Sequence, residues 1–427
     1  MGLMLLLGVF ALCVVIGTPV AFALGIAALS AFWFEGLPLF VGFQRIVAGI
    51  NVFSLMAIPF FIFAGDLMFH GGIAIRLVRF AQAAVGAMRG GLGIVNVFSS
   101  MLFGGISGSA VADISALGSI LIPVMKDKGY DADYAVNVTV TSSIAGIIIP
   151  PSHNMIIFAL ATGGAVSISK LFLAGVVPGI LMCSCLAIAA YVVAVKRGYK
   201  AEKFPGWNAL AFAFVGSIPG LMTAVIIVGG VLSGVFTVTE SGAFGAIYAF
   251  AVTFFVYRSI TWDNFKAAVV SSVRTTSMVM ILIACAGAFA YMLTFYRVPS
   301  KTVDFLLGIT ENPILILLMI NAVLLLLGMI MDMAALILIC TPIFLPVMNM
   351  LGIDPLQFGM ILLVNLGLGL CTPPVGTCLF VGCAVGKLPM EKAIKTIWPF
   401  YFAIFSALML ITFVPAISLT LPNLLGQ

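Results

Sequence analysis

Glycine, proline and serine residues that could bind ions occur in two matching stretches of the chain. Residues 105–163 contain the segment IIPPSHN, and residues 328–386 contain the segment CTPPVGT. A Pro-Pro pair inside an apolar helix removes two backbone donors and frees the carbonyl oxygens of the preceding turn, which are suitable ligands for a hard cation such as Na⁺. A helix that begins beyond such a break points its free N–H groups, and a partial positive charge, at an anion. The two stretches therefore predict cation and anion binding.

The two stretches align without a gap at an offset of 223 residues. The segment Pro123-Val124-Met125 falls on Pro346-Val347-Met348, and Pro150-Pro151 falls on Pro373-Pro374. Shared apolar composition would give scattered matches and would not give several matches in one register. We interpret the pair as an internal duplication, and we expect the functional site where the copies meet.

The composition is that of a polytopic membrane protein, because 63% of the 427 residues are hydrophobic and only 8% are charged. The net charge of +5 comes from short basic clusters between apolar runs, so it indicates membrane orientation and no nucleic-acid partner. The eight cysteines lie in apolar segments without metal-binding spacing and are expected to pack as small apolar residues. We therefore expect the chain to lie in a lipid bilayer.

The apolar runs predict an all-α fold. A helix needs about 20 apolar residues to cross the hydrocarbon core. Spanning segments are predicted over residues 3–34, 52–69, 171–195, 208–233, 241–257, 276–296 and 397–421, and residues 36–50 suit an interfacial or hinge helix.

Each copy adds a re-entrant hairpin and a broken helix to this plan. The predicted tips, GGISGS at 104–109 and GMIMD at 328–332, separate apolar arms that are each too short to cross comfortably, and the Pro-Pro pairs break the helices that follow. Broken backbone at this depth must line a polar cavity or be buried in protein.

Basic residues indicate that the two copies have opposite orientations. The turn KDKGYD of the first copy corresponds to NMLGID, which has no basic residue. After the broken helix the pattern reverses, because Lys387, Lys392 and Lys395 cluster only beyond the second copy. The positive-inside rule then predicts an inverted-topology repeat, a common plan of secondary transporters.

Pairing each hairpin tip with its break gives the candidate site residues. The first Na⁺ site is predicted at Gly105, Gly146 and Ser152, and the second at Gly328, Gly369 and Thr372. Polar groups between these sites are predicted to bind the substrate: Ser107, Ser109, Ser152, Asn154, Asp332 and Thr377.

Three ionisable residues have more than one interpretation. Asp113 could pair with a cation, line a domain interface or serve a site. Glu240 is expected to cap a helix. His153 could hydrogen-bond within the broken segment, contact substrate or take up a proton.

Two other classes of function are weaker alternatives. The segment Gly105-Ile106-Ser107-Gly108 fits the GxSG pattern of intramembrane serine proteases, with His153 as the base. The second copy reads GMIM there, and a protease needs no duplication. A passive channel would conduct without coupling to a gradient.

Five blocks in order resemble the large membrane subunit of TRAP (tripartite ATP-independent periplasmic) transporters. They are SLMAIPFFIFAGDLM at 54–68, GGISGSAVADISALGSILIPVM at 104–125, IIPPSHN at 148–154, GVFTVTESGAFGAIYA at 234–249 and CTPPVGTCLF at 371–380. The resemblance implies Na⁺-driven import of an organic acid across the bacterial inner membrane by an elevator-type fold similar to that of the ion transporter superfamily. It implies no enzymatic activity and no organic cofactor.

The resemblance also implies a division of the chain and a set of partners. It places scaffold and arm helices in 1–89, transport-domain repeats in 90–168 and 312–386, scaffold helices in 169–311 with a cytoplasmic loop at 196–207, and a C-terminal arm and scaffold helix in 387–427. A separate four-helix small membrane subunit and a periplasmic substrate-binding protein are the expected partners, because no additional N-terminal helices are seen that could serve as a fused small subunit. A stand-alone Na⁺/dicarboxylate-type carrier without a binding protein is the alternative.

The resemblance assigns roles to some of these residues. Ser107 and Ser152 would face the substrate carboxylate, and the glycine carbonyls would face Na⁺. The PPSHN segment is similar to that of family members that take up sialic acid, so sialic acid is favoured over C4-dicarboxylates. Asp332 is an acid near the expected anion site, so a role beside Na⁺ or a structural role suits it better than contact with the substrate carboxylate.

Overall fold

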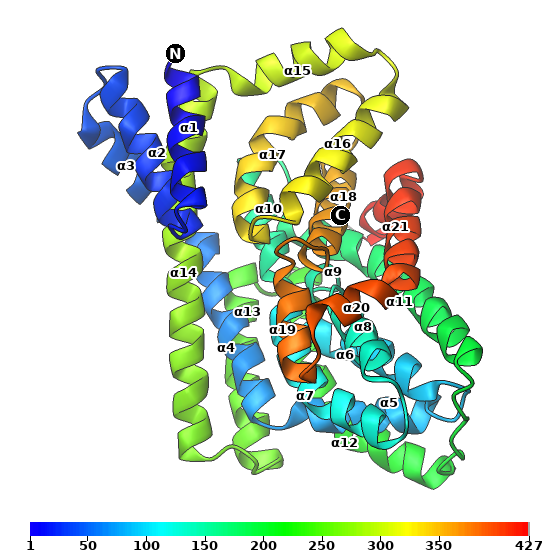
Figure 1. Cartoon of the computed structure of the whole chain (residues 1–427). Coiled ribbons are helices and arrows are strands. Elements are labelled where there is room, and N and C mark those ends of the chain that lie inside the picture. Colours follow the sequence, from blue (N-terminus) through cyan, green and yellow to red (C-terminus); the bar gives the residue numbers. More distant parts are fainter. Residues whose placement is uncertain (426–427) are drawn as a thin grey trace.

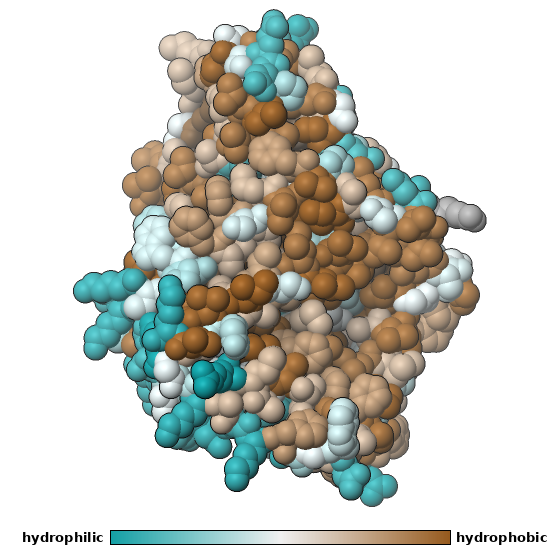
Figure 2. Space-filling model, turned by 90° about the vertical axis from the view of Figure 1, so that its right-hand side faces the viewer, coloured by the Kyte–Doolittle hydropathy of each residue, from teal (hydrophilic) through white to brown (hydrophobic). Residues whose placement is uncertain are grey.

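Helices form throughout the chain because apolar runs in a membrane must satisfy their own backbone hydrogen bonds. The computed structural model describes residues 1–425, and within them no β-strand forms; a single isolated bridge joins Arg89 to Ala201. Among the residues that the structure describes, six helices are long and apolar enough to cross a membrane, or up to eight if each bent pair is one span. Figure 2 shows a mostly apolar face, with hydrophilic residues at its top, along its upper right edge, and on its left and lower sides. A membrane protein is expected to present such a band to lipid.

One group of helices packs around the long helix α14 (Trp262–Phe295). Helices α2, α3 and α4 pack directly on α14, while α1 packs on α2 and α13 packs on α4 (Figure 1). The bounds of this group are α1 Gly2–Val15, α2 Val20–Phe34, α3 Leu39–Ile50, α4 Ala57–His70 and α13 Val238–Ala251, with a 3-10 turn at Phe53–Met56 and a π-helical turn at Val252–Val256.

The duplicated stretches fold into two helix pairs and two interrupted helices. The helix pairs are α6 (Gly91–Ser107) with α7 (Ala110–Asp127), and α16 (Pro313–Gly328) with α17 (Met333–Met350). The interrupted helices are α8 (Ala132–Ser142), α9 (Ala145–Ile148) and α10 (His153–Ala161) in the first stretch, and α18 (Pro355–Leu370) and α19 (Thr377–Gly386) in the second. The first of these bends by 51° at its break.

The two stretches interlock at glycine positions. A β-carbon placed on Gly382 of α19 would lie 2.2 Å from the Val140 side chain of α8, so the absence of a side chain allows close packing. Lys126 at the end of α7 donates to the carbonyl oxygen of Gly386, with 2.5 Å between nitrogen and oxygen. In the opposite sense, α10 of the first stretch packs on α17 of the second. The structure therefore brings residues of both copies to one region.

The remaining helices connect and surround these elements. They are α5 Ile73–Val85, α11 Ile168–Lys196, α12 Trp207–Leu232, α15 Val298–Ile309, α20 Met390–Thr396, α21 Trp398–Phe413 and α22 Ala416–Leu425. Although α11 falls in the segment 169–311, where the resemblance implies scaffold helices, it packs along α6, α18, α21 and α22. The last two residues of the predicted segment 387–427 lie outside the described residues.

Three predicted boundaries differ from the structure. The apolar run 3–34 is two helices, because Gly17 has a φ of +88° and Pro19 precedes the first residue of α2. The predicted final helix over 397–421 is divided between α21 and α22 next to Pro415, which cannot supply a backbone donor. The run 276–296 extends back to Trp262, where the Thr261 side chain accepts from the backbone of the first turn.

The first hairpin tip is also shorter than predicted. The sequence indicates a break across 104–109, but α6 continues through Ser107. Gly108 then adopts a φ of +63°, and Ser109 has an extended backbone that begins α7. A single left-handed glycine is thus enough to turn the chain, and the other small residues serve close packing.

Candidate functional site

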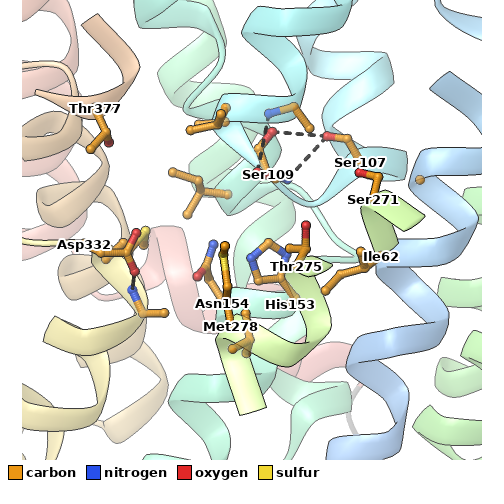
Figure 3. Close-up of a pocket in the computed structure, with 18 of the residues that line it drawn as sticks. Ile62, Ser107, Ser109, His153, Asn154, Ser271, Thr275, Met278, Asp332 and Thr377 are labelled. Carbon is orange, nitrogen blue, oxygen red and sulfur yellow. Dashed lines mark hydrogen bonds between the residues drawn. The ribbon is translucent and has the colours of Figure 1, made fainter. Parts of the chain in front are cut away.

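A cavity of about 820 Å³ lies between the group around α14 and the duplicated stretches. Helices α4 and α14 form one side, and the two hairpin tips with the starts of α10 and α19 form the other. Five of the six predicted substrate residues line this cavity: Ser107, Ser109, Asn154, Asp332 and Thr377 (Figure 3). The sixth, Ser152, is fully buried behind the lining.

The first hairpin tip encloses a buried carboxylate. The Ser107 hydroxyl donates to Oδ1 of Asp113, while the side chain of Asp113 is only 1% exposed and its Oδ2 has no hydrogen-bond partner. A β-carbon on Gly146 would lie 2.8 Å from Asp113 Oδ2 and 3.3 Å from the Ser109 carbonyl oxygen. Asp113, left open by the sequence, is therefore placed beside the predicted residue Gly146.

The start of α10 presents donors that no side chain satisfies. Ser152 occupies the N-cap position, yet its side chain makes no capping bond and its buried Oγ has no partner. His153 and Asn154, the first residues of α10, line the cavity. In an apolar environment unpaired donors are costly, so this helix start is suited to bind an acceptor.

The second hairpin tip differs because its helix start is already occupied by an acid. Asp332 is the N-cap of α17, and its Oδ1 accepts from the backbone N–H of Ala334 at 2.9 Å. The equivalent Ser109 is uncharged and accepts more weakly from Ala112, at 3.5 Å. The carboxylate of Asp332 compensates the positive end of α17. The two copies are therefore electrostatically unequal.

Tip and break lie against each other in both stretches. A β-carbon on Gly105 would lie 3.1 Å from the Pro150 carbonyl oxygen, and one on Gly369 would lie 2.6 Å from the backbone carbon of Gly328. Both Pro-Pro bonds are cis. Thr372 donates its hydroxyl to the Leu368 carbonyl at 2.7 Å. Each tip thus contacts its break, and cation binding by the predicted residues stays a prediction.

Polar residues that the repeat pattern did not predict line the opposite side of the cavity. Asp66 and His70 of α4 and Ser271 and Thr275 of α14 all line it. Asp66 Oδ2 accepts from the Ser272 hydroxyl at 2.7 Å, and His70 Nδ1 bonds the Asp66 carbonyl oxygen at 2.9 Å. One signal was available, because Asp66 is a carboxylate inside an apolar run.

Two smaller expectations are settled by hydrogen bonds. Glu240 forms a capping box with Thr237, whose backbone N–H donates to Glu240 Oε2 at 2.8 Å, and this confirms its predicted capping role. Ser107 Oγ bonds Asp113 and the Ser109 carbonyl oxygen, and among the described residues it makes no bond to His153. The protease alternative is therefore not supported, since the serine lacks its base.

A helical protein with several apolar spans, and with a cavity between two packed groups of helices, is a multi-pass membrane protein by its fold. A solved structure with this fold is the YdaH transporter of Alcanivorax borkumensis, described as having an unusual topology; it matches with a TM-score of 0.65 over 87% of each chain at 14% identity. At that identity the likeness concerns the fold alone.

The sequence comparisons identify the family. Residues 7–417 match the family model of the DctM component of the tripartite ATP-independent periplasmic transporter, so the chain belongs to this family. It is 40% identical to the uncharacterised protein YgiK of Salmonella typhimurium, over 99% of this chain and 97% of that protein. It is 35% identical to the C4-dicarboxylate large permease DctM of Rhodobacter capsulatus over the full length of both, and 37% identical to the sialic acid large permease SiaM of Vibrio cholerae over 96% and 95%.

Proposed function

We propose that this chain is the transport subunit of a Na⁺-coupled importer of an organic acid anion in the bacterial inner membrane. The observation that carries the proposal is the first hairpin, where the buried Oδ2 atom of Asp113 has no hydrogen-bond partner and lies beside Gly146. Gly108 of the same tip lies against His153 at the start of α10, where the Ser152 hydroxyl also lacks a partner. The first hairpin would therefore bind a cation, and the start of α10 beside it would bind an anion.

The anion would bind at the start of α10. Backbone N–H groups there, with Ser109 and Asn154 from the cavity lining, can donate to a carboxylate. The start of α17, the matching position in the second copy, is not suited to bind an anion, because the Asp332 carboxylate already compensates the partial positive charge of that helix end. This asymmetry supports one anion site shared by the two copies.

The cations would bind where tip meets break. An ionised carboxylate in an apolar interior is strongly unfavourable unless it is paired, so a Na⁺ beside Asp113 Oδ2 would stabilise the first hairpin. The Ser109 carbonyl oxygen lies on the same side, next to Gly146. The contact of Gly328 with Gly369, together with Thr372, supports a second site of backbone and hydroxyl oxygens. Hard oxygen ligands suit such ions.

The remaining features of the proposal are its partners, its mechanism and its substrate. The isethionate permease DctMQ of Oleidesulfovibrio alaskensis matches 96% of this chain, which covers 65% of that protein. We therefore propose that a separate small membrane subunit and a periplasmic binding protein complete the system. We propose transport by an elevator mechanism in oppositely oriented repeats, with sialic acid favoured and a C4-dicarboxylate next.

Uptake in proteoliposomes tests the proposal. The chain would be reconstituted with its small subunit and supplied with the cognate binding protein, and uptake of radiolabelled acid would be measured under an inward Na⁺ gradient, an equal K⁺ gradient, or ATP without a gradient. Uptake is expected only with Na⁺ and the binding protein. Full uptake with K⁺ or with ATP alone would contradict Na⁺ coupling, and full uptake without the binding protein would favour the stand-alone carrier.

A further inference from the structure

Within the described residues, the ionisable side chains that line the cavity include acids but no lysine or arginine. They are the carboxylates Asp66 and Asp332 and the imidazoles His70 and His153. The buried carboxylate of Asp113 lies directly behind the first tip. A cavity proposed to take an anion is thus lined by acids and has no permanent cation of its own.

The two carboxylates lie at opposite sides of the predicted anion position. In Figure 3, Ser271 and Thr275 of α14 lie with Ile62 of α4 on one side, and Asp332 and Thr377 lie on the other, with His153 and Asn154 between them. Asp66 is on the α4 side, one turn beyond Ile62, and Ser272 fixes its carboxylate. A bound molecule whose carboxylate sits at the start of α10 therefore extends toward an acid in either direction.

The imidazoles do not change this balance. His70 follows Asp66 by one helical turn and bonds its backbone carbonyl, so this imidazole lies beside an acid and gives the cavity no cation apart from it. His153 belongs to the start of α10, where the first carboxylate is proposed to bind. A second carboxylate on the substrate would have no cationic partner and would be repelled by Asp66 or Asp332.

We infer that the cavity selects a monocarboxylate whose remaining part carries hydrogen-bond donors such as hydroxyl groups, and that Asp66 determines this specificity. The inference rests on the proposed function and names the substrate class of the same site. Asp66, Ser271 and Thr275 provide acceptors for hydroxyl donors, and hydrogen bonds to a charged carboxylate are the stronger ones. A volume of about 820 Å³ is large enough for a sugar acid.

Three six-carbon acids separate the effect of hydroxyl groups on binding from the effect of a second carboxylate. Hexanoate carries one carboxylate, gluconate adds hydroxyl groups, and adipate adds a second carboxylate at the far end. Their binding to the full chain in lipid nanodiscs would be measured by calorimetry in NaCl and in choline chloride. In NaCl we expect gluconate to bind at least about 10-fold more tightly than hexanoate or adipate, which corresponds to about 1.4 kcal/mol.

Asp66→Asn is the informative variant, and Asp263→Asn is its control because Asp263 lies in the exposed first turn of α14 outside the cavity. Asp66→Asn is expected to reduce the preference for gluconate over hexanoate and to raise the affinity for adipate by about 10-fold. Asp263→Asn is expected to bind all three acids as the unmodified chain does.

The outcomes are distinguishable. Na⁺-dependent binding in which adipate equals or exceeds gluconate would overturn this inference and leave the proposed function standing. A selective preference that Asp66→Asn leaves unchanged would overturn the role of Asp66. Failure of all three acids to bind in NaCl would overturn the inference together with the proposed anion site.

Discussion

Individual carboxylates have different roles in this protein because their surroundings differ. Asp332 is paired with the start of α17, whereas Asp113 has one oxygen bonded to Ser107 and the other without a partner. Burying an unpaired charge is unfavourable, and binding a cation relieves that cost. Asp113 is therefore the residue at which Na⁺ binding and local stability should be coupled.

Replacing Asp113 by Asn should separate stability from Na⁺ binding. Without Na⁺ the variant is expected to unfold at the same or a higher temperature, because the buried charge is gone. The rise in unfolding temperature on adding Na⁺ should be lost. Half-maximal uptake should need about 10- to 100-fold more Na⁺, because the variant loses a charged ligand that contributes about 1.5–3 kcal/mol to Na⁺ binding. Asp304→Asn, on exposed helix α15, is the control. An unchanged Na⁺ response in Asp113→Asn would exclude Asp113 as a ligand.

Side chains at Gly146 or Gly369 should disturb the predicted ion sites. A β-carbon at these positions would lie 2.8 Å from Asp113 Oδ2 and 2.6 Å from the Gly328 backbone carbon, respectively. Gly146→Val and Gly369→Val are each expected to destabilise the local packing by about 1–3 kcal/mol and to weaken the Na⁺ dependence of uptake. Membrane insertion, measured by fractionation, should be retained. Gly216→Val is the control because nothing lies within 4 Å of its β-carbon position. A wild-type Na⁺ response in both site variants would refute the ligand assignment.

At the scale of elements, a polar cluster joins the start of α8 to the end of α11. Arg197 donates to both oxygens of Asp133, at 2.9 and 2.8 Å, and to Asp131 at 3.0 Å. Hydrogen bonding to Asp133 raises the pKa of Arg197. Burial and a hydrogen bond to Asp131 raise the pKa of Tyr199 to about 12. This cluster fixes the end of a long helix on the first copy.

Replacing Arg197 by Leu should lower the free energy of unfolding by about 1 kcal/mol, since the pair is partly exposed and therefore screened. Thermal unfolding in detergent measures the effect, and Lys196→Leu is an exposed neighbouring control. The raised pKa of Tyr199 means that the contribution of this tyrosine is fully present below its unfolded value of about 10 and is lost as the pH rises through about 12. The difference between the unmodified chain and Arg197→Leu should therefore be the same at about pH 6 and about pH 9. An Arg197→Leu variant as stable as Lys196→Leu would show that the cluster contributes nothing.

The sequence predicted elements best where a backbone signal was strong. The Pro-Pro pairs and the tip at Asp332 fall where helices end or begin. Hydropathy alone missed the turn at Gly17, because apolar residues continue through it. The far wall of the cavity was missed for another reason: Asp66 and Thr275 lie on helices distant in sequence and outside the repeat, so only packing brings them together.

At the scale of the whole molecule, the two copies and α11 pack as one group against the group around α14. The cavity lies between these groups, so its walls belong to parts that an elevator would move relative to each other. The rings of Phe61 on α4 and Phe172 on α11, with centroids 6.4 Å apart, form an apolar contact at this interface. Apolar contacts are non-directional and permit sliding.

Cross-linking across this contact should stop transport. Cysteines at positions 61 and 172, in a background with the eight native cysteines replaced by alanine, would be joined by a short bis-methanethiosulfonate reagent. Uptake in proteoliposomes is expected to fall to background and to return on reduction, because a tether fixes one group against the other. The control pair replaces Phe158 and Phe358, which lie on α10 and α18 with centroids 6.0 Å apart inside one group, and its cross-link should leave uptake intact. Undiminished uptake with complete cross-linking between positions 61 and 172 would contradict relative sliding of α4 and α11, and with it the elevator mechanism in this form.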